Sequence, residues 1–174
     1  MRHTLRLHPD SLCVAATQIE ADIARPRPGG LILSYVVSGR ISDLRWAPVV
    51  TPACADELWR HTCFEAFVRP STGSAYYEFN FSPSTQWAAY RFDSYRSGMR
   101  VATEIDTPRI EVRSSAETYT LQAELKFDGL SSPLHLGLSA VLEETNGRKS
   151  YWALAHPPGK ADFHHADCFA LELS

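Results

Sequence analysis

Hydrophobic side chains recur at every second position of this chain, in short blocks separated by clusters of Gly, Pro, Ser and Asn. The run Tyr76-Tyr-Glu-Phe-Asn-Phe81 shows this alternation most clearly. Neighbouring side chains of a β-strand point to opposite faces, so a period of two is typical of strands. We therefore expect an all-β protein of roughly nine to eleven strands. One short helix is expected from Thr51-Pro52, because Thr caps free backbone amides and Pro fits the first helical position.

The length of the chain suits one domain over residues 1–174, because a single core commonly occupies about 100–200 residues. The strands must bury their apolar faces against one another. For this many strands we expect two packed antiparallel sheets, a β-sandwich of jelly-roll type.

Charge and hydropathy argue against two classes of partner. The net charge of −3 offers no broad attraction for nucleic acid. No apolar stretch approaches the ~18–20 residues needed to span a bilayer. The first ten residues lack the apolar core of a secretory signal, which favours a cytoplasmic protein. The sequence requires no cofactor and makes no prediction of the oligomeric state.

Three aromatic-rich blocks joined by turn sequences indicate a meander of strands over residues 62–69, 75–82 and 86–93. Side chains that alternate with the core residues would share one outer face, which collects Glu65, Phe67, Tyr76, Glu78, Asn80, Trp87 and Arg91. Aromatic rings stack on the C–H faces of a sugar, and carboxylate, amide or guanidinium groups bond its hydroxyls. The alternative is an ordinary solvated face with weak cross-strand ion pairs.

Two regions carry longer motifs. The first is Asp56-Glu-Leu-Trp-Arg-His-Thr-Cys-Phe-Glu-Ala-Phe-Val68, followed by Tyr76-Tyr-Glu-Phe-Asn-Phe-Ser-Pro83 and Trp87. It resembles the DOMON-like superfamily, which includes family-9 carbohydrate-binding modules and haem domains of the cellobiose-dehydrogenase type. The second, Tyr151 to Phe169, is similar to small bacterial DOMON-like proteins. The resemblance implies a β-sandwich that holds a sugar or a haem.

Sugar-binding members of that superfamily place indole rings beside the ligand, and Trp59 matches the motif best. Its alternative role is that of a core residue that anchors the loop before a strand. We expect a non-catalytic module for a carbohydrate-like small molecule. The expected ligand-binding residues are Trp59, Glu65, Tyr76, Glu78, Asn80, Trp87, Arg91 and Trp152.

Two chemical alternatives stay open. Haem in domains of this type is held axially by Met with His or Lys, which implies Met99 with His156 or Lys160 here. Paired carboxylates on neighbouring strands are the machinery of glycoside hydrolases, and Glu65 with Glu78 would fit that role. A module whose sheet edge or apolar patch meets another protein is a third alternative.

Histidine and carboxylate side chains crowd the region after Tyr151. Imidazole is a competent metal ligand, so His156, His164 and His165 are candidates for a metal site. A hydrogen-bonded turn explains the His-His pair equally well. This segment reads as a long loop over one end of the sheet, and such loops often supply binding groups. Its phenylalanines could instead cap the core.

Overall fold

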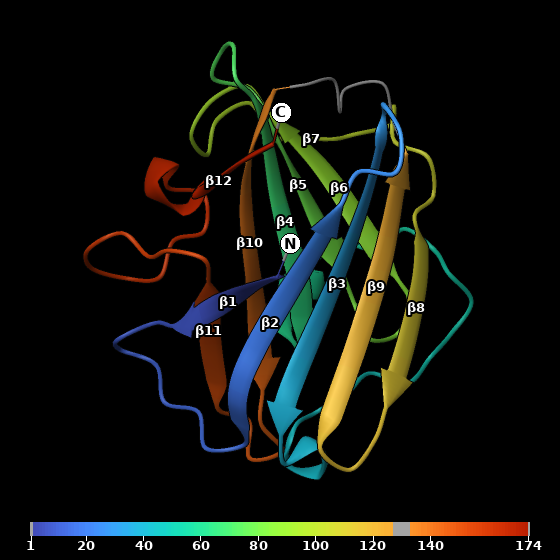
Figure 1. The fold of residues 1–174 in the computed structure, drawn as a ribbon, viewed down its shortest axis with the longest axis vertical. Coiled ribbons are helices and arrows are strands. Elements are labelled where there is room, and N and C mark those ends of the chain that lie inside the picture. The colour runs from blue at the N-terminus through green and yellow to red at the C-terminus, as the bar shows by residue number, and fades with distance from the viewer. Residues whose placement is uncertain (1, 127–132, 174) are drawn as a thin grey trace.

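A computed structural model describes residues 2–126 and 133–173, which form an antiparallel β structure (Figure 1). The strands are β1 (Arg2–Leu7), β2 (Ala16–Ala24), β3 (Gly30–Gly39), β4 (Cys63–Pro70), β5 (Tyr76–Phe81), β6 (Trp87–Phe92), β7 (Arg100–Val101), β8 (Arg109–Ser114), β9 (Thr118–Lys126), β10 (Leu134–Glu143), β11 (Lys149–Ala153) and β12 (Leu171–Leu173). Short 3-10 helices cover Ile41–Asp43, Leu58–Arg60 and Ala166–Cys168. Among the described residues, no helix is long and apolar enough to cross a membrane.

The strands pair along one continuous path, β7-β6-β5-β4-β10-β11-β1-β2-β3-β9-β8, with β12 beside β10. Strand β1 links the two halves, because Arg2–Leu5 pair with β2 while Arg6 and Leu7 pair with β11. The sheet curls strongly, so that β2, β3 and β9 lie across from β4 and β5 (Figure 1). The all-β expectation is confirmed, but the expected two-sheet sandwich is not, since the pairing forms one path.

The expected meander is confirmed, with each boundary shifted by one residue. Strands β4, β5 and β6 pair consecutively and antiparallel. The described residues form twelve strands rather than nine to eleven. The additional ones include β1, whose few apolar residues gave no clear alternation, and the two-residue β7.

The helix expected from Thr51-Pro52 is wrong. The backbone N–H of Ala55 donates to the carbonyl of Trp87 at 2.8 Å, and the N–H of Trp87 donates to the carbonyl of Ala53 at 3.1 Å. This segment therefore runs extended beside β6, and its backbone groups form hydrogen bonds with Trp87 instead of with a helical turn. Glu57 then adopts a positive φ of 58°, which a helix interior does not allow.

Apolar side chains pack in two clusters, one on each face of β4, β5 and β6. The larger cluster fills the inside of the curled sheet and includes Phe64, Phe79 and Phe81. The smaller one lies on the other face and joins strand residues to the segment after β11; it consists of Phe67, Tyr76, Ala88, Tyr90, Phe92, Val141, Ala153, Phe163 and Phe169. The C-terminal segment is thereby fixed against the outer face of the sheet.

One glycine permits this close contact. A side chain at Gly137 on β10 would place its Cβ 2.8 Å from the carbonyl oxygen of Cys168. Only a residue without Cβ lets the C-terminal segment approach the strand so closely. The C-terminal segment can therefore form a wall of a cavity rather than a solvated loop.

Candidate ligand-binding site

Strand register decides which side chains share the outer face. Glu65 lies opposite Asn80, and Phe67 lies opposite Glu78, across β4 and β5. Glu78 in turn lies opposite Tyr90 on β6. Glu65 and Glu78 are thus diagonal neighbours on one face, as expected from the alternation.

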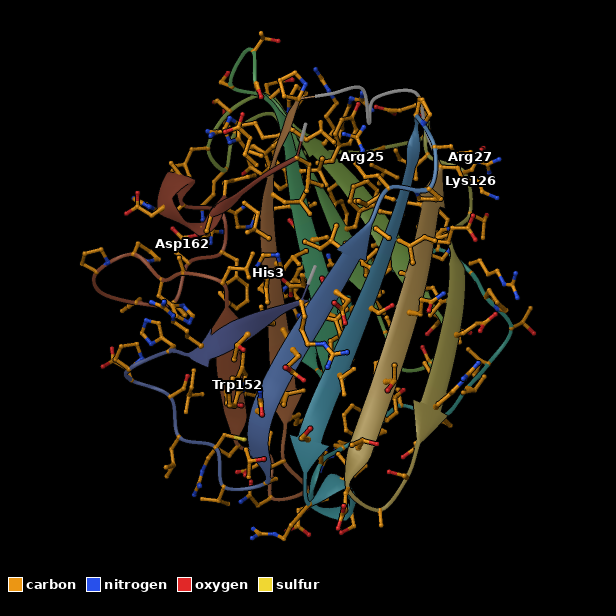
Figure 2. The ribbon with its side chains drawn as sticks, viewed as in Figure 1. His3, Arg25, Arg27, Lys126, Trp152 and Asp162 are labelled. Atoms are coloured by element: carbon orange, nitrogen blue, oxygen red, sulfur yellow. The ribbon has the colours of Figure 1, made fainter. Side chains whose placement is uncertain are left out.

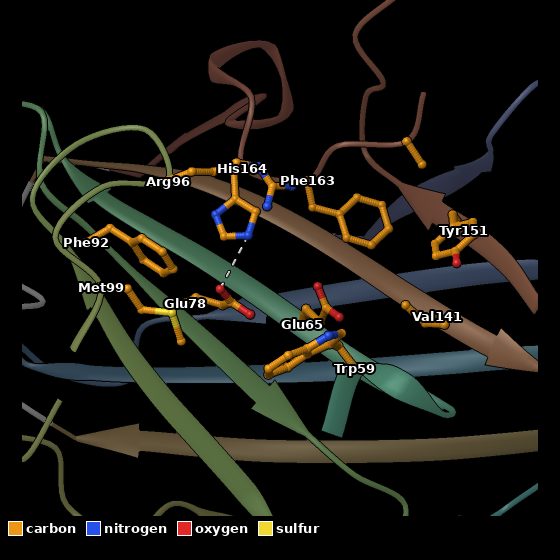
Figure 3. Close-up of a pocket in the computed structure, with 11 residues that line it drawn as sticks. Trp59, Glu65, Glu78, Phe92, Arg96, Met99, Val141, Tyr151, Phe163 and His164 are labelled. Carbon is orange, nitrogen blue, oxygen red and sulfur yellow. Dashed lines mark ion pairs between the residues drawn. The ribbon is translucent and has the colours of Figure 1, made fainter. Parts of the chain in front are cut away.

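A cavity of about 470 Å³ opens on this face, between the strands and the C-terminal segment (Figure 3). Its lining combines aromatic, apolar and ionisable side chains: Trp59, Glu65, Glu78, Phe92, Arg96, Met99, Val141, Tyr151, Ala161, Phe163 and His164. Cavities of about 300–1,000 Å³ with a few polar groups among apolar walls are typical of small-molecule sites.

The carboxyl group of Glu65 is buried at the base of this cavity. The residue is only 3% exposed, and its Oε2 accepts a hydrogen bond from Ser139 Oγ at 3.4 Å. Burial raises the pKa of Glu65 well above its ordinary value, and the nearby charge of Glu78 raises it further. Glu65 is consequently the carboxyl of the pair that holds a proton more firmly.

Glu78 is buried as well but better supplied with partners. Asn80 Nδ2 donates to its Oε1 at 2.8 Å, and His164 Nε2 lies 3.5 Å from its Oε2, the contact dashed in Figure 3. Burial raises the pKa of Glu78, while the hydrogen bond from Asn80 and the charge of Arg96 oppose that shift. The ionised form is therefore better supported at Glu78 than at Glu65.

Hydrogen bonds fix the tautomer of His164. The Tyr76 hydroxyl accepts from the backbone N–H of Arg96 at 3.2 Å and lies 2.8 Å from His164 Nδ1. An ionised Glu78 only accepts hydrogen bonds, so the neutral ring carries its proton on Nε2, facing Glu78, and Nδ1 accepts from the Tyr76 hydroxyl. Burial lowers the pKa of His164 from 6.5 to about 4, so the ring is neutral at pH 7.

Aromatic rings form the remaining walls. Trp59 follows the left-handed turn at Glu57, is 37% exposed and meets the ring of Tyr90 edge-on at 6.1 Å. The Tyr90 hydroxyl donates to Asp56, and this bond holds the loop that carries Trp59. Phe163 and Tyr151 line the opposite side (Figure 3). The ring of Trp59 can contact a ligand, because it borders the cavity and is not enclosed by the core.

Two expected site residues, Trp87 and Arg91, lie on the wrong face. Trp87 pairs with Phe81 and Arg91 pairs with Tyr77, so both belong to the side of β6 that faces the inside of the curled sheet. Trp87 is buried in the larger apolar cluster. Phe92, which pairs with Tyr76, lines the cavity in their place.

Three further expected residues do not line the cavity. Trp152, on β11 (Figure 2), belongs to the larger apolar cluster, and its neighbour Tyr151 lines the cavity instead. Asn80 is fully buried and orients Glu78. Tyr76 is buried and orients His164.

The three candidate metal ligands do not converge. His156 Nε2 lies 2.8 Å from the carbonyl of Arg6, and His165 Nδ1 lies 3.5 Å from Asp167. His164 alone lines the cavity. Within residues 2–126 and 133–173, no three His, Cys, Asp or Glu side chains gather to hold a metal ion.

The residues that we considered for haem are also apart. Met99 lines the cavity and is 52% exposed. Neither His156 nor Lys160 lines it, and Lys160 instead borders a separate hollow beside His8. Haem binding therefore gains no support from this geometry.

Sequence reasoning missed several residues of the cavity. The alternation of strand side chains could have identified Phe92 and Tyr151. Phe92 points to the opposite face of β6 from Trp87, and Tyr151 to the opposite face of β11 from Trp152. For Phe163 we considered capping of the core as an alternative to a binding role, and the residue packs in the smaller, outer cluster while it also lines the cavity. Arg96 lies in a turn with a positive φ of 51°, and nothing in its local sequence links it to the cavity.

Fold and cavity together define an all-β protein with one curled antiparallel sheet and a partly enclosed, mixed polar and apolar site. No protein-family model matches the sequence, and no curated protein matches it. Among solved structures, a crystal structure described as a "putative carbohydrate-binding protein" from Bacteroides uniformis is similar to this chain. The TM-score is 0.64 at 12% identity, over 97% of this chain and 83% of that one. At this identity the similarity establishes the fold alone.

Proposed function

We propose that this protein is a non-catalytic module that binds a carbohydrate-like small molecule in the cavity between β4, β5 and the C-terminal segment. The observation that carries the proposal is the meeting of two buried carboxyl groups with partly exposed aromatic rings in one cavity of about 470 Å³. The similar solved structure, described as a "putative carbohydrate-binding protein", supports it. Membership of the DOMON-like superfamily, a single domain over residues 1–174 and a cytoplasmic location remain predictions.

The cavity walls suit the two kinds of surface that a sugar presents. Trp59 and Phe92 offer flat faces to C–H groups, and Glu65, Glu78 and Arg96 offer hydrogen bonds to hydroxyls. Most polar partners are already oriented, since Asn80 holds Glu78 and Tyr76 holds His164. A preformed site lowers the entropic cost of binding.

Tryptophan fluorescence during titration with a panel of mono- and disaccharides tests this proposal. We expect a saturable change in emission, because Trp59 borders the cavity. Trp59→Ala should weaken the affinity about two- to tenfold, as measured by calorimetry. The control is Trp46→Phe, since Trp46 stacks on Tyr119 at 3.7 Å and does not line the cavity. Flat traces and no heat for every sugar would contradict the proposal.

One observation favours a second candidate, glycoside hydrolysis. Glu65 and Glu78 line one cavity, and burial raises the pKa of both, as a general acid requires. Turnover of chromogenic glycosides by the wild type but not by Glu65→Gln would establish it. No turnover would remove this candidate and leave the binding proposal intact.

A further inference from the structure

The two glutamates of the cavity have few positively charged partners. Arg96 is the cationic side chain among the lining residues, and its Nη2 is already paired with Asp162 Oδ1 at 2.8 Å. His164 is neutral at pH 7 because burial lowers its pKa to about 4. The charge of Arg96 lowers the pKa of Glu78, but within the described part of the chain no lysine or arginine forms an ion pair with Glu65 or Glu78.

Glu65 also has unused hydrogen-bonding capacity. Among the described residues, the one hydrogen bond to its carboxyl group comes from Ser139 Oγ to Oε2, at a long 3.4 Å. Its Oε1 has no partner there, although the residue is 97% buried. In Figure 3 the carboxyl group points into the space between Trp59 and Phe163. Oε1 is open to the cavity rather than enclosed by protein, so a donor on a ligand can reach it.

We infer that the ligand carries a protonated amine, which lies between the carboxyl groups of Glu65 and Glu78. The inference rests on the proposed function, and it narrows the substrate class from carbohydrates in general to amino sugars. An ammonium group has three hydrogen-bond donors and one positive charge, so it can donate hydrogen bonds to both carboxyl groups at once. A sugar hydroxyl has one donor and no charge.

The surrounding rings favour the same ligand chemistry. Trp59 and Phe92 line the cavity together with both glutamates. Aromatic faces attract cations, most strongly when the cation is removed from water. The thioether of Met99 adds an apolar contact for the ring carbons of the ligand. An inorganic cation has no apolar groups that could pack against these walls, so the cavity favours an organic amine over a metal ion.

Binding of an amine should release protons from the protein. The titratable and charged groups around the pair are Cys63 on β4, Tyr76 on β5, Tyr90 on β6, Tyr35 across the sheet, Arg96 from the turn after β6 with its partner Asp162, and His164 from the C-terminal segment. Burial raises the pKa of Cys63 and of the tyrosines and lowers that of His164, so these groups stay neutral near pH 7. A bound cation lowers the pKa of Glu65 and Glu78, so any proton that it displaces comes from this pair.

Calorimetric titration with four probes tests the inference at pH 7 and fixed ionic strength. The probes are glucosamine, glucose, N-acetylglucosamine and butylamine. We expect glucosamine to bind at least about tenfold more tightly than glucose or N-acetylglucosamine, which lack the charge. Repeating the glucosamine titration in buffers of different ionisation enthalpy should show net proton release.

Isosteric variants locate the effect. Glu65→Gln and Glu78→Gln should each reduce the preference for glucosamine over glucose by about tenfold, while circular dichroism shows that both variants are folded. The matched control is Glu20→Gln on β2, a partly exposed residue that pairs with Arg2 and does not line the cavity. This control should keep the wild-type preference.

The outcomes separate the two proposals. Equal or tighter binding of glucose overturns the amine inference and leaves carbohydrate binding in place. Tight binding of butylamine with no response to any sugar supports the amine inference and overturns the carbohydrate function. Retention of the preference in both glutamine variants overturns the assignment to Glu65 and Glu78. No binding of any probe overturns both proposals.

Discussion

His164 should control much of the acid sensitivity of this protein. Burial lowers its pKa from 6.5 to about 4, so between those values an unfolded chain binds a proton that the folded chain excludes. The free energy of unfolding therefore falls as the pH falls through this range. The change from 6.5 to about 4 corresponds to about 3 kcal/mol, at 1.36 kcal/mol for each pH unit.

The variant His164→Asn removes the titration and keeps the hydrogen bond, because an amide oxygen can accept from the Tyr76 hydroxyl in place of Nδ1. Urea unfolding followed by fluorescence at pH 7 and pH 4 gives the free energies. We expect the variant to lose about 3 kcal/mol less than the wild type between these values. The more exposed neighbour provides the control, His165→Asn, which should follow the wild type.

Two results would refute this reasoning. Parallel pH profiles of wild type and His164→Asn would show that the ring does not titrate differently in the folded state. An NMR titration of His164 with a midpoint near 6.5 would show that attraction to Glu78, 3.5 Å away, offsets the effect of burial.

Three other changes should alter stability in defined ways. Glu65→Gln should raise the melting temperature near neutral pH, and the gain should shrink as the pH falls, because the raised pKa of Glu65 penalises folding only where the unfolded carboxyl ionises. Tyr76→Phe should cost about 1–3 kcal/mol in urea unfolding, since it leaves His164 Nδ1 buried without its donor. Gly137→Ala should also cost about 1–3 kcal/mol, because the new Cβ would lie 2.8 Å from the carbonyl of Cys168. An unchanged midpoint in either of the last two would contradict the contact concerned.

The alternation of apolar and polar residues identified the strands and divided the side chains of each strand between two faces. It could not predict which face of one strand continues which face of the next strand. On β5 and β4 the division was right, and Glu65 and Glu78 do share a face. On β6 the division was also right, yet the Trp87 set was assigned to the cavity. The register depends on the turn length between β5 and β6, and a slip of one residue exchanges the two faces.

The remaining parts of the cavity depend on contacts between residues far apart in the chain. Arg96 reaches the site because its backbone N–H donates a hydrogen bond to the Tyr76 hydroxyl and its side chain pairs with Asp162. Phe163 reaches it because Gly137 lets the C-terminal segment approach β10. Neither arrangement follows from a periodic pattern, since each rests on tertiary packing rather than on local propensity.

Strand β1 makes folding of this chain depend on a contact between its two ends. Residues Arg6 and Leu7 hydrogen-bond to Ala153 and Trp152, so the seam between the halves joins segments that emerge from the ribosome almost a full chain length apart. Contacts of such sequence separation form slowly, because a very long loop must close first. Until then one edge of β11 and the Arg6–Leu7 end of β1 are unpaired, and a nascent chain at this stage is most exposed to aggregation and to capture by chaperones.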